Sequence, residues 1–188
     1  TENYVISEAS LHAWRLEHEV ETPVILGPGI VDLRTDLQIG KKQMLTIRAG
    51  TRVRMAKGVS IISEGKTLIE GTSEKPVLFE RLIGNEAWGG VALQGREASG
   101  SIIRHAEFKG GTTIKHANVF YSGMVSVHHA ERVAIENSTF SKNTISDDTL
   151  HIVNSDVSLS KIQFSDCYSD CINLDYSSSD MSDIQIDR

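Results

Sequence analysis

The chain has 188 residues, of which 39% are hydrophobic and 23% charged, a composition typical of a globular domain that buries a sizeable core. Its formal net charge of −6 equals the balance of residues 141–188, which hold nine Asp, no Glu and three basic residues. An acidic end without a cluster of Lys and Arg argues against nucleic acid as a partner. The lack of a run of about 18 apolar residues predicts no membrane span.

The first segment differs in pattern from the rest of the chain. Ile6, Ala9, Ala13 and Leu16 are spaced to line one face of a helix. A stack of repeats needs a cover over its first coil. We therefore expect residues 1–23 to form an N-terminal cap or extension.

Short apolar strands separated by turn residues follow in the N-terminal half. Gly-containing turns stand between them, where Gly adopts backbone conformations closed to β-branched residues. The predicted strands are Leu37–Ile39, Leu45–Ile47, Val53–Met55, Ser60–Ile62, Thr67–Ile69 and Val77–Phe79.

A repeat of about 22–25 residues organises the C-terminal half. Asp148–Ile152 resembles Asp170–Leu174 at an offset of 22 residues, and Val133–Phe140 matches Val157–Phe164 at an offset of 24. An earlier copy begins near Val91, and we expect it to be lengthened by a loop over residues 112–119.

Three short strands per repeat predict a solenoid of stacked β-strand coils, because one coil cannot bury its own apolar face. Equivalent residues then form columns through the interior. The predicted inward columns are Val91/Val125/Leu150/Ile172, Leu93/Val127/Ile152/Leu174 and Phe108/Phe140/Phe164/Ile186. A β-sandwich or jelly roll remains the alternative fold.

Three phrases of the N-terminal half resemble a known family. They run from Leu45 to Val53, from Ile69 to Phe79, and from Trp88 to Val91. They are similar to the opening coils of bacterial right-handed parallel β-helix domains of the pectate-lyase-like superfamily, including the coils that accompany CotH-type proteins. The resemblance implies an all-β, right-handed parallel β-helix over residues 24–188. It does not extend to a kinase domain, and fold alone does not establish function.

Stacking also predicts polar columns on the outside of the coils. These columns are Ala92/Ser126/His151/Asn173 and Gln94/His128/Val153/Asp175. Asp148 and Asp170 start the same strand in adjacent coils, which lie about 4.8 Å apart. A calcium ion between these two Asp residues is therefore the one cofactor that we predict. We expect His128, His151, Asn173 and Asp175 to form a ligand-binding face beside it.

Three interpretations of this face are open. The Asp residues could cap turns by bonding to backbone N–H groups. The face could bind a polysaccharide or a protein partner, as a non-catalytic scaffold module of a larger, exported or surface bacterial protein. The alternative is a carbohydrate-active enzyme, a polysaccharide lyase or a glycoside hydrolase, with Asp148, Asp170 and His151 as candidate catalytic residues. We expect the binding module, in an extracellular or cell-surface location.

Two further features concern single residues. Cys167 and Cys171 are the only cysteines. Free cysteines are often buried, so two thiols are the first interpretation and a disulfide is the second. Trp88 belongs to a fold-typical phrase, so we expect it to pack rather than to bind a sugar.

The last predicted strand lies close to the final residue. Asp183–Ile186 matches Lys161–Phe164 of the preceding coil, two residues before Arg188. A solenoid that ended there would expose core side chains and unpaired backbone groups. We therefore expect the β-helix to be truncated at its C-terminal end. Further domains of the same polypeptide, or self-association through the open C-terminal coil, would cover it.

Overall fold

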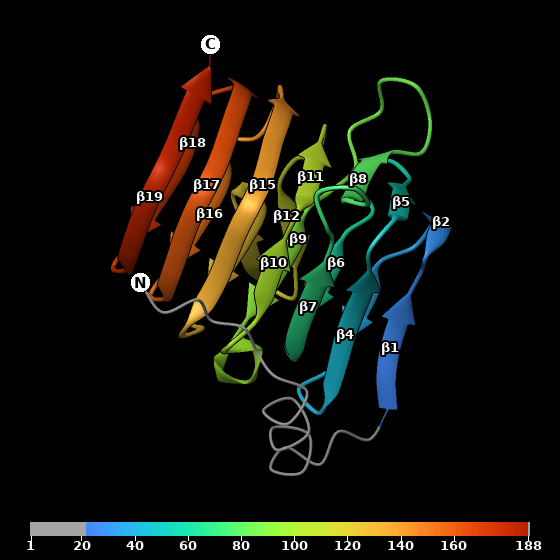
Figure 1. Ribbon diagram of the computed structural model, residues 1–188, viewed down its shortest axis with the longest axis horizontal. Helices are drawn as coiled ribbons and strands as arrows, with labels where there is room; N and C mark the ends of the chain where they lie inside the picture. The colour runs from blue at the N-terminus through green and yellow to red at the C-terminus, as the bar shows by residue number, and fades with distance from the viewer. Residues whose placement is uncertain (1–21, 188) are drawn as a thin grey trace.

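A computed structural model describes residues 22–187 and confirms a parallel β-helix in this part of the chain. Successive coils follow one another along the long axis, in the order of the sequence (Figure 1). Every strand pair of the two main sheets is parallel. This finding makes the β-sandwich and jelly roll wrong, because those folds are built from antiparallel strands. Outside these sheets, the described residues form a small hairpin and one short 3-10 helix, η1 (Arg96–Ala98).

One strand of each coil belongs to a six-stranded sheet. Its strands in spatial order are β18 (Asp170–Asp175), β16 (Asp148–Val153), β14 (Gly123–His128), β9 (Val91–Gln94), β6 (Ile61–Ser63) and β3 (Leu37–Ile39).

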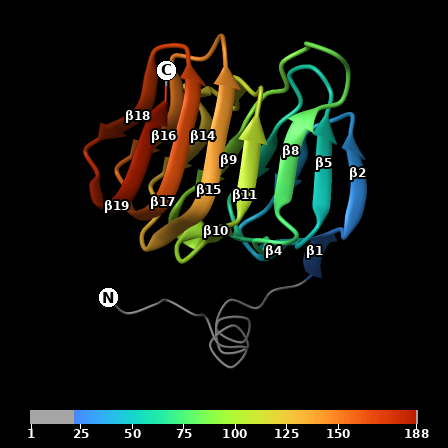
Figure 2. The ribbon, with the colours of Figure 1, turned by 45° about the horizontal axis from the view of Figure 1, so that its top comes forward.

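The other strand segments form an eleven-stranded sheet with two arms. The first arm contains β1 (Thr22–Leu26), β4 (Gln43–Arg48), β7 (Lys66–Glu70) and β10 (Ile102–Arg104). The second arm contains β2 (Gly29–Leu33), β5 (Thr51–Met55), β8 (Val77–Arg81) and β11 (Ala106–Lys109). Three longer strands run through both arms: β15 (Val133–Asn143), β17 (Asp156–Cys167) and β19 (Ser178–Asp187). Figure 2 shows this sheet in front of β14, β16 and β18.

The predicted columns are present in the core. Val91, Val125, Leu150 and Ile172 are partners in successive strands of the six-stranded sheet. A column of stacked phenyl rings fills the second arm, with ring centroids 4.5 to 5.1 Å apart, and consists of Phe79, Phe108, Phe140 and Phe164. These rings are at most 1% exposed. The apolar spacing of the sequence therefore predicts both the coil and its register.

Each corner of the later coils holds a residue in the left-handed backbone region. This conformation turns the chain without interrupting the stack of strands, although it is unfavourable for most side chains. Asn137, Lys161 and Asp183, with φ between 48° and 54°, bend the three long strands between the two arms. The corner after the six-stranded sheet is formed in the same way by Gly95, His129, Asn154 and Tyr176.

The insertion is a β-hairpin rather than the expected loop over residues 112–119. β12 (Ile114–His116) pairs antiparallel with β13 (Val119–Tyr121). Ile114 and Tyr121 pack against Ile62 and Ala92 on the outer face of the six-stranded sheet. Burial of these apolar residues holds the hairpin against the solenoid.

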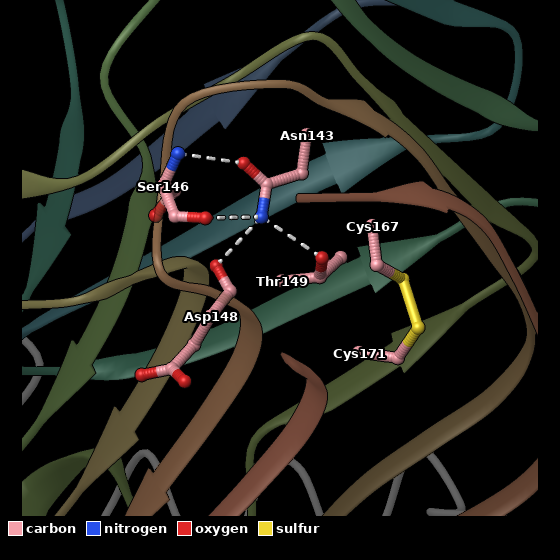
Figure 3. Close-up of a disulfide and its surroundings, with 6 residues drawn as sticks. All are labelled: Asn143, Ser146, Asp148, Thr149, Cys167 and Cys171. Carbon is pink, nitrogen blue, oxygen red and sulfur yellow. Dashed lines mark hydrogen bonds between the residues drawn. A yellow bond between two sulfur atoms is a disulfide. The ribbon is translucent and has the colours of Figure 1, made fainter. Parts of the chain in front are cut away.

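A disulfide joins Cys167 to Cys171, so the interpretation of two free thiols was wrong. Its position explains its role. Cys167 pairs in register with Asn143 of the preceding coil, whose side-chain amide donates to the Ser146 carbonyl at 2.9 Å and to the Thr149 hydroxyl at 3.0 Å (Figure 3). Because Cys171 aligns with Thr149, the disulfide closes the turn that hydrogen bonds close one coil earlier.

The structure describes the C-terminal end of the predicted β-helix but almost none of its predicted N-terminal cap. The predicted cap over residues 1–23 lies outside the described residues, except for the two that begin β1. In the last described coil the inward columns reach partly exposed residues, among them Leu174 at 38%, Met181 at 42% and Ile186 at 56% exposure.

Within the described part of the chain, no helix is long and apolar enough to cross a membrane. Trp88 is fully buried beside Phe79 and donates to the Lys109 carbonyl, as expected of a packing residue.

Candidate functional site

The predicted polar columns lie on the outer face of the six-stranded sheet. Ser126, His151 and Asn173 are partners in successive strands, and so are His128, Val153 and Asp175. These residues face outward from the coil, yet His128 and His151 are only 6% and 8% exposed. The outer face is therefore a packed polar surface rather than an open one.

Asp148 anchors this surface from a buried position. Its carboxyl group is 1% exposed and accepts hydrogen bonds from the Ser122 hydroxyl and, at 3.2 Å, from the Asn173 amide. Asp170 is its partner in register on β18 but is exposed. Both oxygens of Asp148 thus have a partner already, and each partner is a side chain of a neighbouring coil.

His151 lies at the centre of what we call the His151 cluster: Ser122, Asp148, His151, Asn173 and Asp175. Its Nδ1 lies 2.7 Å from the Ser122 hydroxyl oxygen, and its Nε2 lies 3.1 Å from Oδ2 of Asp175. Oδ2 of Asp148 lies 3.8 Å from Nδ1. The imidazole therefore connects a buried serine to a carboxylate at the surface.

No metal arrangement is evident in the described structure. Among residues 22–187, no group of three or more His, Cys, Asp or Glu side chains is placed to hold an ion. The proposed calcium would have to use Asp170 and an Asp148 whose oxygens are engaged. It stays a prediction, and an increase of the melting temperature with millimolar calcium would support it.

His128 belongs to the same face but has a different environment. Its ring centroid lies 4.7 Å from that of Tyr121 and 5.2 Å from that of His151, edge to face. Its Nε2 is buried without a hydrogen-bond partner in the described structure. Burial, together with the nearby His151 and His129, lowers the pKa of His128 to about 4, so the ring is neutral at pH 7. His129 instead lies at the corner, where Nδ1 contacts the Asn154 amide.

A crevice of about 390 Å³ opens between the β12–β13 hairpin and the outer face. We call it the hairpin crevice. The Tyr121 hydroxyl donates to Oε1 of Gln94 at 3.1 Å. Burial and the negative charge of Glu64 raise the pKa of Tyr121, so its hydroxyl keeps its proton. The polar side chains of the lining are Gln38, Glu64, Gln94, His116 and Tyr121, and Ile62 adds an apolar surface.

Sequence reasoning missed two residues of this region. Tyr121 and Ser122 end the insertion, which we expected to be a loop. Ser122 precedes β14 and approaches His151 from outside the regular columns, so a register argument does not place it there. The only signal available was the Tyr-Ser-Gly sequence before a predicted strand, which is not specific.

Comparisons with known proteins do not assign a family. No protein-family model matches the chain, and no curated protein matches it. A solved structure of QnrB1, described as a plasmid-mediated fluoroquinolone resistance protein, aligns with 85% of this chain and 92% of its own. The identity is 9% and the TM-score is 0.20, so this likeness carries no argument. The parallel β-helix rests on the strand pairing, and the resemblance to pectate-lyase-like and CotH-associated coils remains a proposal.

Proposed function

We propose that this chain is a scaffold module of an exported protein, related to pectate-lyase-like β-helices, and that its hairpin crevice binds carbohydrate. The observation that carries this proposal is the composition of the crevice. Two amide side chains, a carboxylate and a tyrosine surround a small apolar surface. A volume of about 390 Å³ lies in the range of small-molecule sites, which combine apolar walls with a few placed polar groups.

Carbohydrate matches these groups better than other small ligands do. A sugar ring offers paired hydroxyl groups that donate and accept, as the amides of Gln38 and Gln94 do. Its C–H faces pack against apolar side chains, and Val119, which lines the crevice and is 37% exposed, offers one. The carboxylate of Glu64 disfavours an anionic ligand at this position, so a neutral sugar is the expected class.

The location outside the cell is supported by the disulfide. Disulfides persist in oxidising compartments and are rare in the cytosol. The bridge between Cys167 and Cys171 therefore favours an extracellular or cell-surface protein. Residues 24–188 would form the β-helix, and residues 1–23 its cap.

The exposed inward residues of the last coil favour a cover at this end. We propose self-association through these residues, since an uncovered strand edge promotes pairing. Light scattering at increasing concentration tests this proposal. A chain that stays monomeric at every concentration would contradict it.

A glycan array followed by calorimetric titration tests the binding proposal. We expect an array-positive neutral oligosaccharide to lose at least about tenfold in affinity with Gln94→Ala, because a hydrogen bond worth about 1.4 kcal/mol corresponds to a factor of ten. Gln163→Ala, on an exposed position of the other sheet, is the matched control. Equal loss in both variants, or no glycan bound at all, would contradict the proposal.

A carbohydrate-active enzyme is the second candidate, because carboxyl groups flank His151 on both sides. A lyase would also need a Lys or Arg beside Asp148 or Asp170 to abstract a proton. Among residues 22–187, the ion pair described for Asp148 involves His151 and no Lys or Arg. Binding is therefore the function that we favour. Release of unsaturated products from uronate polysaccharides would reverse this preference.

A further inference from the structure

Ser122, His151 and Asp175 form a continuous hydrogen-bonded row across three coils. The Ser122 hydroxyl oxygen lies 2.7 Å from Nδ1 of His151, and Nε2 of His151 lies 3.1 Å from Asp175. Both distances are within hydrogen-bond range, as required when a base activates a nucleophile and a third group orients that base. The row runs from a nearly buried serine to an Asp175 side chain that is 51% exposed.

The close approach of Ser122 depends on Gly123. A Cβ atom added to Gly123 would lie 2.9 Å from the backbone nitrogen and 3.0 Å from Cβ of His151. Such contacts are too short for any other residue without a shift. The chain therefore brings its serine against the imidazole at a place where only glycine fits.

Asp175 determines which imidazole nitrogen can act as a base. An acceptor on Nε2 holds the proton of the neutral ring there, which leaves the lone pair of Nδ1 facing Ser122. The Ser122 hydroxyl donates its one proton to Asp148 in this structure, so the hydroxyl must rotate toward Nδ1 before that proton can pass to His151. If Nδ1 takes the serine proton, the resulting imidazolium lies between two carboxyl groups, with Asp175 at 3.1 Å and Asp148 at 3.8 Å.

We propose that Ser122 is the nucleophile of an ester-hydrolysing site, with His151 as its base and Asp175 as the positioning residue, acting on O-acyl groups of small molecules. Ser122 Oγ attacks the acyl carbon while its proton passes to Nδ1 of His151. The bond to the alcohol oxygen then breaks, and this oxygen takes the proton from His151 and leaves as the alcohol. A water molecule deprotonated by the same nitrogen cleaves the acyl-serine, which releases the acid and regenerates Ser122.

The site lies next to the hairpin crevice. Tyr121 precedes Ser122 in the chain and lines the crevice, and its ring lies against that of His128. The ester proposal goes beyond carbohydrate binding and does not depend on it. If both hold, acylated sugars are the natural substrate class.

The test uses p-nitrophenyl acetate as substrate and a fluorophosphonate probe for activated serine. We expect slow nitrophenolate release and labelling of Ser122, identified by peptide mass spectrometry. Ser122→Ala should abolish both, and His151→Gln should lower the rate by about 10²-fold or more, the contribution usual for a general base. Ser158→Ala, on the other sheet, is the control that keeps the basal rate.

Two readouts separate this role from a structural one. Asp175→Asn should lower the rate and shift the rise of its pH profile to lower pH, because one negative charge beside His151 is removed while Asp148 and His128 remain. Asp175→Glu should restore part of the rate. A folded wild-type protein that is neither labelled nor active, or labelling unchanged by Ser122→Ala, would overturn the proposal. These wild-type measurements decide the matter even if a variant fails to fold.

Discussion

The turn closed by Cys167 and Cys171 offers a perturbation whose size can be worked out. The bridge joins residues four positions apart. In the chain-entropy account, a closed loop of about five residues stabilises the folded state by about 2 kcal/mol. The preceding coil closes the equivalent turn with the amide of Asn143. Removing the disulfide should therefore lower the free energy of unfolding. Replacing it by the Asn and Thr pair of the preceding coil should restore part of that free energy.

Two double variants separate these effects. Cys167→Ser with Cys171→Ser should lower the free energy of unfolding by about 2 kcal/mol, or the melting temperature by about 4–8 °C for a domain of this size. Cys167→Asn with Cys171→Thr recreates the Asn143–Thr149 pair and should recover about 1 kcal/mol, the usual net value of a hydrogen bond. Recovery should be partial, because the Asn143 amide also donates to the Asp148 carbonyl, five positions further on. The equivalent residue of the next coil, Asp170, lies only three positions after Cys167, so its turn is shorter.

Thermal unfolding by circular dichroism, with and without reductant, measures these differences. Hydrogen exchange in β18 then shows whether the loss is local to the last coil, as nearest-neighbour stacking predicts. Identical melting temperatures for the oxidised and reduced wild-type protein would refute the reasoning. So would a Ser–Ser variant as stable as the Asn–Thr variant.

Three other predictions follow from the fold. The pKa of His128 is lowered to about 4 in the folded protein. Between about pH 6.5 and 4, His128 is therefore protonated in the unfolded chain but neutral in the folded one. The free energy of unfolding should therefore be highest above about pH 6.5 and fall by up to about 3 kcal/mol as the pH approaches 4. Urea titrations at several pH values should show a smaller fall in His128→Phe than in the wild-type protein. An equal fall in both proteins would contradict the burial argument. Leu150→Asp places a charge in a fully buried column and should cost about 4 kcal/mol or more, whereas Gln163→Asp on an exposed position should be tolerated; similar melting temperatures for the two variants would mean that the register is wrong. Lys161→Asn should gain about 0.5–1 kcal/mol, because Asn tolerates the left-handed backbone at φ 54° better than Lys does; Lys109→Asn, within a strand, is its control, and an equal gain there would exclude the corner as the cause.

The sequence predicts the coil and its register well because both depend on repeated apolar spacing. Leu150 and Ile172 occupy equivalent positions 22 residues apart, and stacking makes them partners. The corners could not be predicted in the same way. Lys161 and Tyr176 adopt positive φ at positions where their side-chain types give no signal, because the surrounding stack imposes the conformation.

The candidate site was predictable only in part. The columns containing His128, His151, Asn173 and Asp175 follow from the register. The contact of Ser122 with His151 does not, because it depends on a local approach at Gly123 and on a hairpin whose pairing lies outside the repeat. The sequence also left undecided whether Cys167 and Cys171 form a disulfide, since the spacing of two cysteines does not specify the geometry of the turn between them.

Hydrogen exchange of the protein with a bound neutral oligosaccharide tests the central claim most directly. The account predicts increased protection in the hairpin, residues 114–121, and in the neighbouring strands β6 and β9, with little change in β17 and β19. Protection confined to the eleven-stranded sheet, or no difference between the free protein and a protein saturated with the oligosaccharide, would contradict the placement of the binding site in the hairpin crevice.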